Sequence, residues 1–189
     1  EIDDGDACFF AGGSPTYLRH VTGSGEDGDL IWTHTTANSG QANFATWTLY
    51  FEAAGRYRID AYTAHAYAQS KQAAYLVHAS GTTTSVTIDQ RAVDGWQSLG
   101  EFDFAAGGGQ SVHLADNTGE AAANDVQLAL DAIRIVPAGA TPVDTPPPAD
   151  GDDDDDDDHA GCAAGSSGSW LLALAALGVR RRRRDRMRR

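Results

Sequence analysis

The chain has 189 residues and a formal net charge of −13, but this charge is distributed too unevenly for one uniform domain. Residues 1–138 carry −11, residues 139–160 carry −9 and residues 161–189 carry +7. The overall acidity therefore describes no single part of the chain. We predict three segments with these bounds: a globular domain, a linker and a C-terminal tail.

The globular segment, residues 1–138, is predicted to be all-β. Short runs in which apolar and polar residues alternate are separated by Gly, Asn and Asp, which is the period-2 pattern of half-buried antiparallel strands. The expected strands are residues 45–51, 56–62, 74–78, 84–88, 96–104, 110–115 and 128–136. Within them, Trp47 and Trp96 are predicted to face the core. Seven or more short strands at this spacing favour an antiparallel two-sheet sandwich over a βαβ fold.

Five short blocks in this segment resemble a known family. In chain order they read Ala-Gly-Arg-Tyr at 54–57, Tyr-x-Val-His at 75–78, Thr-Ile-Asp-Gln at 87–90, Gly-Trp-x-x-Leu-Gly-x-Phe-x-Phe at 95–104 and Leu-Asp-Ala-Ile-Arg-Ile at 130–135. Together they are similar to the golvesin/xanthan-lyase C-terminal domain, over nearly all of residues 2–137. The resemblance implies a jelly-roll, carbohydrate-binding-like module of the kind found at the ends of polysaccharide-degrading and cell-wall enzymes. The resemblance does not identify ligand-binding residues in this chain.

Candidate glycan-binding residues are aromatic side chains in polar surroundings. A sugar ring stacks on an exposed aromatic face, while nearby amides and charged groups bond its hydroxyls. Tyr67 fits this pattern, because Gln69 and Lys71 accompany it in a polar loop between two expected strands. For Trp32, a core role and a ligand-binding role are equally compatible with the sequence.

Catalytic chemistry has little support in the sequence. The six histidines form no HxH or HxxxH cluster, and Ser24 in Gly-Ser-Gly lacks the strand-to-helix context of a nucleophile elbow. We therefore predict no enzyme activity, no catalytic residue and no cofactor. One alternative stays open: many jelly-roll sugar modules bind a structural calcium near their terminal strands, where Asp4 and Asp131 could meet.

The linker, residues 139–160, is predicted to be disordered. Five of the six prolines lie between Pro137 and Pro148, and seven consecutive aspartates follow at 152–158, so the segment buries too little apolar surface to fold. A solvated spacer is the favoured interpretation, and metal buffering by the Asp run is the alternative. Because Cys8 and Cys162 lie on opposite sides of the linker, we expect separate roles for them and no structural disulfide.

The tail, residues 161–189, is predicted to be a sorting and anchoring signal with a short hydrophobic helix. Gly161-Cys162 precedes an apolar run at 170–179, and eight arginines follow that run. Residues 163–179 number 17, near the lower limit for crossing a bilayer, and the arginines would stay on the cytoplasmic side. A nucleic-acid-binding end is the alternative, but it leaves the apolar run unexplained.

This arrangement resembles the myxobacterial C-terminal sorting tail (MYXO-CTERM). The resemblance covers about the last 29 residues. It implies that a sorting protease processes the chain at Cys162 and that Cys162 carries a surface anchor. The protein would then be exported and held at the cell surface or outer membrane, with the membrane as a partner and no nucleic-acid partner.

Three functions are compatible with these features. The first is a surface-anchored, non-catalytic module that binds carbohydrate, either extracellular polysaccharide or peptidoglycan. The second is the C-terminal accessory domain of a longer secreted enzyme that degrades polysaccharide or cell wall and whose catalytic part precedes Glu1. The third is a structural or adhesive surface module without a sugar ligand.

Overall fold

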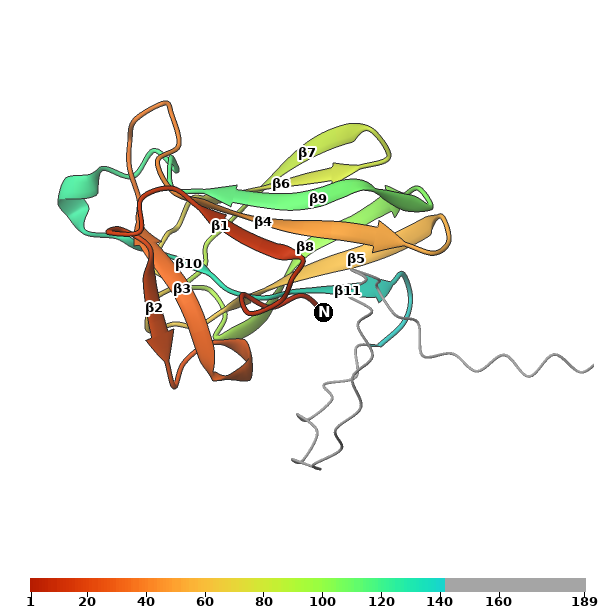
Figure 1. The fold of residues 1–189 in the computed structure, drawn as a ribbon, viewed down its shortest axis with the longest axis horizontal. Helices are drawn as coiled ribbons and strands as arrows, with labels where there is room; N and C mark the ends of the chain where they lie inside the picture. Colours follow the sequence, from red (N-terminus) through yellow and green to blue (C-terminus); the bar gives the residue numbers. More distant parts are fainter. Residues whose placement is uncertain (142–189) are drawn as a thin grey trace, which may run out of the picture.

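The structure is a computed structural model that describes residues 1–141, which form an antiparallel β-sandwich of eleven strands (Figure 1). The predicted fold class is therefore confirmed. The linker beyond residue 141 and the whole predicted tail, including Cys162, lie outside the described residues. Within residues 1–141, none of the helices has the length and hydropathy that crossing a bilayer requires.

One layer of the sandwich is a five-stranded sheet in the order β1-β4-β9-β6-β7. Its strands are β1 (Phe9–Gly12), β4 (Phe44–Phe51), β9 (Gly107–Ala115), β6 (Ala73–Ala79) and β7 (Thr82–Ile88). Strand β4 shows why the sheet has one apolar face: Trp47, Leu49 and Phe51 are buried, whereas the side chains between them are exposed. This alternation is the one that the sequence predicts for residues 45–51.

The second layer is divided into two three-stranded sheets, β11-β5-β8 and β10-β3-β2. The first contains β5 (Gly55–Thr63), β8 (Gly95–Phe104) and β11 (Ile133–Pro137), and the second contains β2 (Arg19–Thr22), β3 (Asp29–His34) and β10 (Gln127–Leu130). The expected strand at 128–136 is thus two strands separated by Asp131 and Ala132. Because β10 and β11 follow each other so closely, this segment joins the two sheets.

The N-terminal residues are tied to the same junction. Ile2 forms an isolated antiparallel bridge with Ile133, with N–O distances of 2.9 and 3.0 Å. A short 3-10 helix, η1 (Glu26–Gly28), lies between β2 and β3, and a second, η2 (Ala122–Asn124), precedes β10. The N-terminal segment, η1 and the β10–β11 junction are therefore brought together although they are far apart in sequence.

The core lies between the layers and is closed by aromatic contacts. The Phe51 and Phe104 rings stack with centroids 4.3 Å apart, and Trp47 is 1% exposed. The prediction that Trp47 is a core residue is confirmed.

Cys8 packs against this core and is bonded in a disulfide. The prediction that Cys8 takes part in no structural disulfide is therefore wrong. The other cysteine of the chain, Cys162, lies outside the described residues.

Candidate functional site

Trp32 and Tyr67, the two aromatic residues proposed to bind a glycan, contact each other. Trp32 lies on β3 and Tyr67 in the loop between β5 and β6, and their rings stack with centroids 5.8 Å apart and an interplanar angle of 27°. Both side chains are partly buried. The loop holds Tyr67 in place through a turn in which the backbone N–H groups of Tyr67 and Ala68 donate to the carbonyl of Ala64.

Much of the Trp32 ring is already in contact with protein. Arg19, its register partner on β2, places its guanidinium carbon 4.5 Å from the ring centroid. The His34 ring meets the indole edge-on at 5.1 Å, and His34 Nε2 is 3.1 Å from a carboxylate oxygen of Asp125. The indole Nε1 is buried without an acceptor in the described part of the chain. Tyr67 is thus better placed than Trp32 to offer a ring to a ligand.

The Tyr67 loop borders an open hollow of about 540 Å³, lined by His65, Gln69, Arg91 and Val126. The backbone N–H groups of Gln69 and Ser70 both donate to the carbonyl of Gln127, at 2.9 and 3.0 Å, which fixes the loop against β10. On its other side, the His65 N–H donates to Asp94 Oδ1 at 3.0 Å. The hollow therefore has a rim of fixed backbone with polar side chains turned to solvent.

The four predicted ligand residues have different places in the structure. Gln69 lines the hollow, whereas Trp32 and Tyr67 form the stacked pair. Lys71 is exposed on the Tyr67 loop, and its backbone N–H donates to Glu120 Oε1 at 3.1 Å. Sequence reasoning missed Arg91 and His65. Both lie in short connections between strands, and alternation within the strands carries no signal about which connections meet.

Trp96 is not a core residue, so that prediction is wrong. Its indole is partly exposed on the outer face of the β11-β5-β8 sheet. The Tyr62 ring meets it edge-on at 5.2 Å, and the Arg134 guanidinium carbon lies 4.4 Å from its ring centroid. Arg134 is also held 3.1 Å from Asp60 Oδ2, so it covers the indole in a fixed position.

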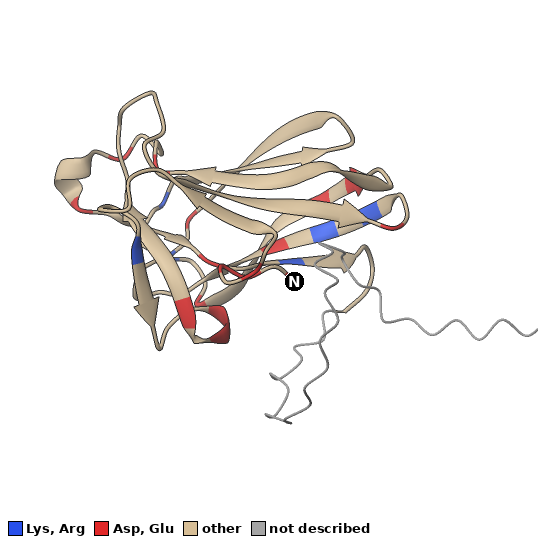
Figure 2. Ribbon diagram, in the orientation of Figure 1, with Lys and Arg blue, Asp and Glu red and all other residues tan. Residues whose placement is uncertain are grey.

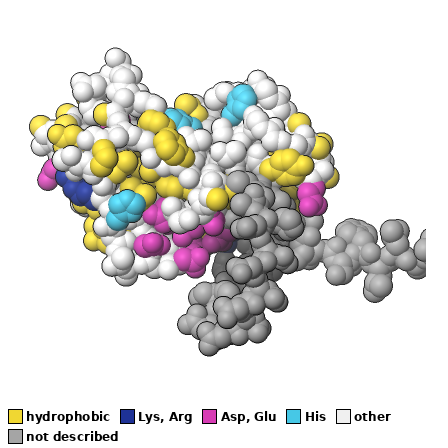
Figure 3. All heavy atoms as spheres, in the orientation of Figure 1, with side chains coloured by type: hydrophobic (Ala, Val, Ile, Leu, Met, Phe, Trp, Pro, Cys, Tyr) yellow, Lys and Arg dark blue, Asp and Glu magenta, His cyan; other side chains and the backbone are white. Residues whose placement is uncertain are grey.

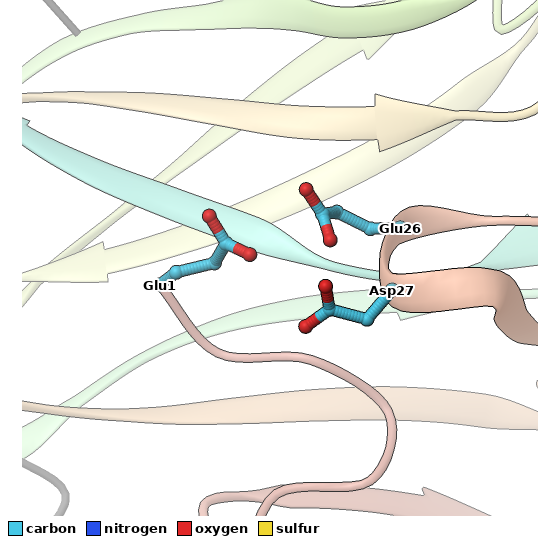
Figure 4. Close-up of side chains that lie close together, drawn as sticks. All are labelled: Glu1, Glu26 and Asp27. Atoms are coloured by element: carbon cyan, nitrogen blue, oxygen red, sulfur yellow. The ribbon is translucent and has the colours of Figure 1, made fainter. Parts of the chain in front are cut away.

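A second candidate site is an acidic cluster, which we define as Glu1, Asp3, Asp4, Glu26, Asp27, Asp29 and Asp131. Figure 2 shows acidic positions on the N-terminal segment, on η1 and at the start of β3, and in Figure 3 acidic side chains gather in one patch on the visible face. Figure 4 shows the carboxylates of Glu1, Glu26 and Asp27 converging. These three have oxygens within 4.8 Å of one another, as do Asp3, Asp4 and Asp29.

Asp131 forms the buried floor of the cluster. Asp131 is 2% exposed, and its Oδ1 accepts hydrogen bonds from the N–H groups of Glu26 and Ala132 at 3.3 and 3.0 Å. Its Oδ2 is buried and has no partner within residues 1–141. Burial, with the nearby charges of Asp3 and Asp4, raises the pKa of Asp131 to about 8. Asp4 and Asp131, suggested by sequence as calcium ligands, thus belong to one electrostatically coupled cluster.

Desolvation also raises the pKa values of three other carboxyl groups in the cluster. The pKa rises to about 7 for Asp3, to about 6 for Asp4 and to about 7 for Glu26. Carboxyl groups this close together repel one another when they are ionised. The folded cluster therefore keeps protons at a pH where isolated carboxyl groups have released them.

Fold and surface together define a β-sandwich module with an aromatic pair beside an open polar hollow. The chain belongs to the Golvesin C-terminal domain family, whose model matches residues 18–137. No curated protein matches the chain. The family predicted from the five sequence blocks is therefore confirmed for the domain, whereas the sorting-tail resemblance stays a prediction.

The solved structures that the chain resembles include the following two. A xanthan lyase from Paenibacillus is 22% identical, with a TM-score of 0.57 over 72% of this chain and 13% of the lyase. The GH26-CBM35 β-(1,4)-mannanase of Podospora anserina is 18% identical, with a TM-score of 0.38 over 67% of this chain and 29% of the mannanase. At these identities the likeness to the lyase supports the fold alone. The chain spans a small part of either protein.

Proposed function

We propose that the domain is a non-catalytic carbohydrate-binding module that takes a polysaccharide or peptidoglycan strand at the hollow beside Tyr67. The observation that carries the proposal is that one loop supplies both an aromatic ring and the polar wall of an open hollow. A sugar ring can stack on the tyrosine while the Gln69 amide, the His65 imidazole and the Arg91 guanidinium bond its hydroxyl or carboxylate groups.

Two basic side chains near the hollow suit an acidic glycan. Residues 1–141 contain six Lys and Arg side chains, of which four contact carboxylates or an aromatic ring: Arg19, Arg56, Arg58 and Arg134. The side chains of the other two, Lys71 and Arg91, have no partner among the described residues. Both belong to the segments around the hollow, and a guanidinium can bind a sugar carboxylate through two parallel hydrogen bonds.

A second candidate function is the accessory domain of a longer secreted enzyme. The likeness to a protein named as a xanthan lyase, of which this chain spans 13%, supports this alternative. Glycan binding at the hollow would be the same in both cases. The two differ in whether a catalytic domain accompanies the module, which the sequence of the complete gene would decide.

We further propose that the tail exports and anchors the domain. The support is the order of Gly161-Cys162, the apolar run and the arginines. A sorting protease would act at Cys162, the membrane would hold the tail during export, and the domain would be displayed at the cell surface or outer membrane.

The glycan proposal is tested by titrating the full chain with carboxylated and neutral polysaccharides. We expect the wild-type protein to prefer the carboxylated ones, and Arg91→Ala to weaken that binding about tenfold, the loss expected for one charged hydrogen bond. Arg56→Ala is the matched control, because Arg56 is exposed and pairs with Glu101 and Asp103, at the opposite end of β5 from the hollow. Absence of binding to any glycan would favour the structural or adhesive module, and equal effects of the two variants would move the site elsewhere.

A further inference from the structure

Among the edge strands of residues 1–141, β7 alone lacks the features that normally prevent an edge from pairing with another chain. An edge strand exposes unpaired N–H and C=O groups, and native proteins protect it by shortness, charged residues, proline, bulges or a covering segment. The edges β1, β2 and β10 have four residues each, β8 carries Glu101 and Asp103, and β11 carries Arg134 and Pro137. Strand β7 has seven residues, Thr-Thr-Thr-Ser-Val-Thr-Ile, and pairs with β6 without a register shift.

The sheet that ends in β7 is also free of charge. None of its five strands contains Asp, Glu, Lys or Arg, and Figure 2 shows β6 and β7 without a charged position. The carboxylates beside β7, on Glu101 and Asp103, line a hollow of about 310 Å³ with Thr82 and Thr84. Arg56 pairs with both carboxylates, at 2.9 and 3.4 Å. In a domain whose residues 1–138 carry −11, β7 is therefore an edge at which two copies can meet without opposing like charges.

The hairpin geometry determines which backbone groups of β7 are directed outward. A two-residue turn at 80–81 joins β6 to β7, and Ala79 pairs with Thr82 beside this turn. In such a hairpin the flanking pair is hydrogen-bonded, and bonded and non-bonded pairs then alternate along the two strands. The exposed residues whose N–H and C=O groups are directed away from β6 are therefore Thr83, Ser85 and Thr87.

We propose that β7 pairs antiparallel with β7 of a second copy of this chain, around a two-fold axis at Ser85. Ser85 then lies opposite Ser85 of the partner subunit, and Thr83 lies opposite Thr87 of the partner subunit. Each facing pair exchanges two backbone hydrogen bonds, and the facing hydroxyl groups can bond across the strands. The five-stranded sheets of the two copies become one continuous sheet.

A second copy fits this edge better than an unrelated strand does. The outward side chains of β7 are all hydroxyl-bearing, so the strand is complementary to itself in the antiparallel register. Because both copies use the same edge, the contact closes as a dimer and does not propagate into a fibre.

The dimer would also place two glycan-binding hollows on one assembly. Arg91, which lines the hollow, follows Ile88, the last residue of β7. In the antiparallel pair the two hollows therefore lie toward opposite ends of the joined edge, and one long polysaccharide could bind both with increased apparent affinity. This consequence rests on the proposed function, whereas the pairing of β7 does not.

The test is sedimentation equilibrium of the full chain without glycan, at concentrations from about 10 μM to about 1 mM, the range of a weak and reversible contact. We expect the average mass of the wild-type protein to rise toward that of two chains. Ser85→Pro should raise the dimer Kd at least about tenfold, because it removes an N–H donor from each copy at the two-fold axis. The fold should tolerate this proline, since the Ser85 N–H is directed away from β6.

Two further variants assign the contact to the edge. Ser85→Lys should also weaken the dimer, because it places like charges directly opposite each other. Thr48→Lys is the matched control and should dimerise like the wild-type protein, since Thr48 is exposed on β4, which has a neighbouring strand on each side. If circular dichroism shows that Ser85→Pro does not fold, Ser85→Lys decides. Three outcomes would overturn the proposal: a wild-type protein that stays monomeric throughout, Ser85 variants that dimerise unchanged, or an equal loss in Thr48→Lys, which would assign the contact to the sheet face.

Discussion

Trp47 Nε1 donates a hydrogen bond to the main-chain carbonyl of Asp131 at 3.0 Å. The bond links the five-stranded sheet to the junction between β10 and β11, from the core side. The Asp131 carboxyl group belongs to the acidic cluster on the other side of the same residue. The geometry of the cluster therefore depends on how well the core holds this one backbone position.

Replacing Trp47 by Phe should consequently destabilise the domain. The variant removes the indole N–H, leaves the Asp131 carbonyl without its donor and opens a cavity in the core. We expect a loss of about 2–3 kcal/mol in the free energy of unfolding, measured by urea denaturation. Trp96→Phe is the comparison, because Trp96 is partly exposed and should cost less. Equal losses for the two variants would contradict the central role of the Trp47 bond.

Two glycines in the loop before β3 should respond differently to substitution by alanine. Both have a positive φ, 82° at Gly23 and 98° at Gly25, which disfavours any side chain. A Cβ at Gly23 would meet nothing within 4 Å, whereas a Cβ at Gly25 would overlap the Asp29 carbonyl oxygen. We expect Gly23→Ala to cost about 1 kcal/mol from backbone strain and Gly25→Ala clearly more. Chemical denaturation of both variants in one buffer measures the difference, and a reversed order would show that the loop relaxes freely.

In EDTA, the stability of the domain should fall as the pH rises from about 4 to about 8. The pKa of Asp131 is about 8 and that of Asp3 about 7 in the folded state, against an ordinary value of 3.8. In this range the folded protein holds protons that the unfolded chain has released, so raising the pH favours unfolding. The Tm should be higher at pH 5 than at pH 8, and Asp131→Asn should reduce the difference. A Tm that rises over this range would contradict the assignment of these protons.

Tyr67→Ala should weaken glycan binding by about 1–3 kcal/mol, the range found for aromatic stacking on planar bases. Tyr67→Phe should retain most of the affinity, because the ring remains. Tyr50→Ala is the matched control, since Tyr50 is 46% exposed on β4 of the other layer. Calorimetric titration measures affinity and circular dichroism checks the fold. If Tyr67→Ala binds as well as the wild-type protein, a ring other than Tyr67 holds the sugar.

The state of the cysteines can be read from the intact mass of the exported protein. The chain has two cysteines, so a disulfide at Cys8 within one molecule would occupy Cys162 and prevent an anchor there. If Cys162 is the processed and anchored residue, the mature protein should lack the arginine tail and carry an added mass at Cys162, and Cys162→Ala should abolish surface display. A mass two hydrogens below that of the reduced, unprocessed chain would instead show the intramolecular disulfide and contradict the anchor.

The sequence predicts the regular strands well, because alternation in a half-buried strand is a local property. The expected strand at 56–62 is β5 with one residue missing at each end, and the one at 96–104 lacks only the first residue of β8. The break at Asp131 was not predicted, although the alternation changes phase there: Leu130 and Ile133 are three positions apart, and one alternating strand would place them on opposite faces. Only the packing of the junction against Trp47 and η1 shows that Asp131 is buried.

Site residues were harder to predict for the same physical reason. The acidic cluster joins Glu26 to Asp131, 105 positions apart, and the hollow joins Gln69 to Arg91 and Val126. Such proximity is set by sheet topology, which no local pattern contains. Trp96 shows a related limit. The alternation of residues along β8 places Trp96 on one face of the strand. It does not tell whether that face is turned to the core or to the outer side, where Arg134 covers the indole.

The pairing of β11 with β5 also determines how the domain would carry a mechanical load. Pro137, where the chain leaves β11, pairs with Tyr57 near the start of β5, and the other end of β5, at Thr63, leads into the loop that borders the hollow. A pull between a bound glycan and the following chain would run along these two strands. The hydrogen bonds between the two strands lie across the strand direction, so the pull would load these bonds in shear and they would share the force. The module would therefore resist tension better than one whose last strand could be peeled away bond by bond.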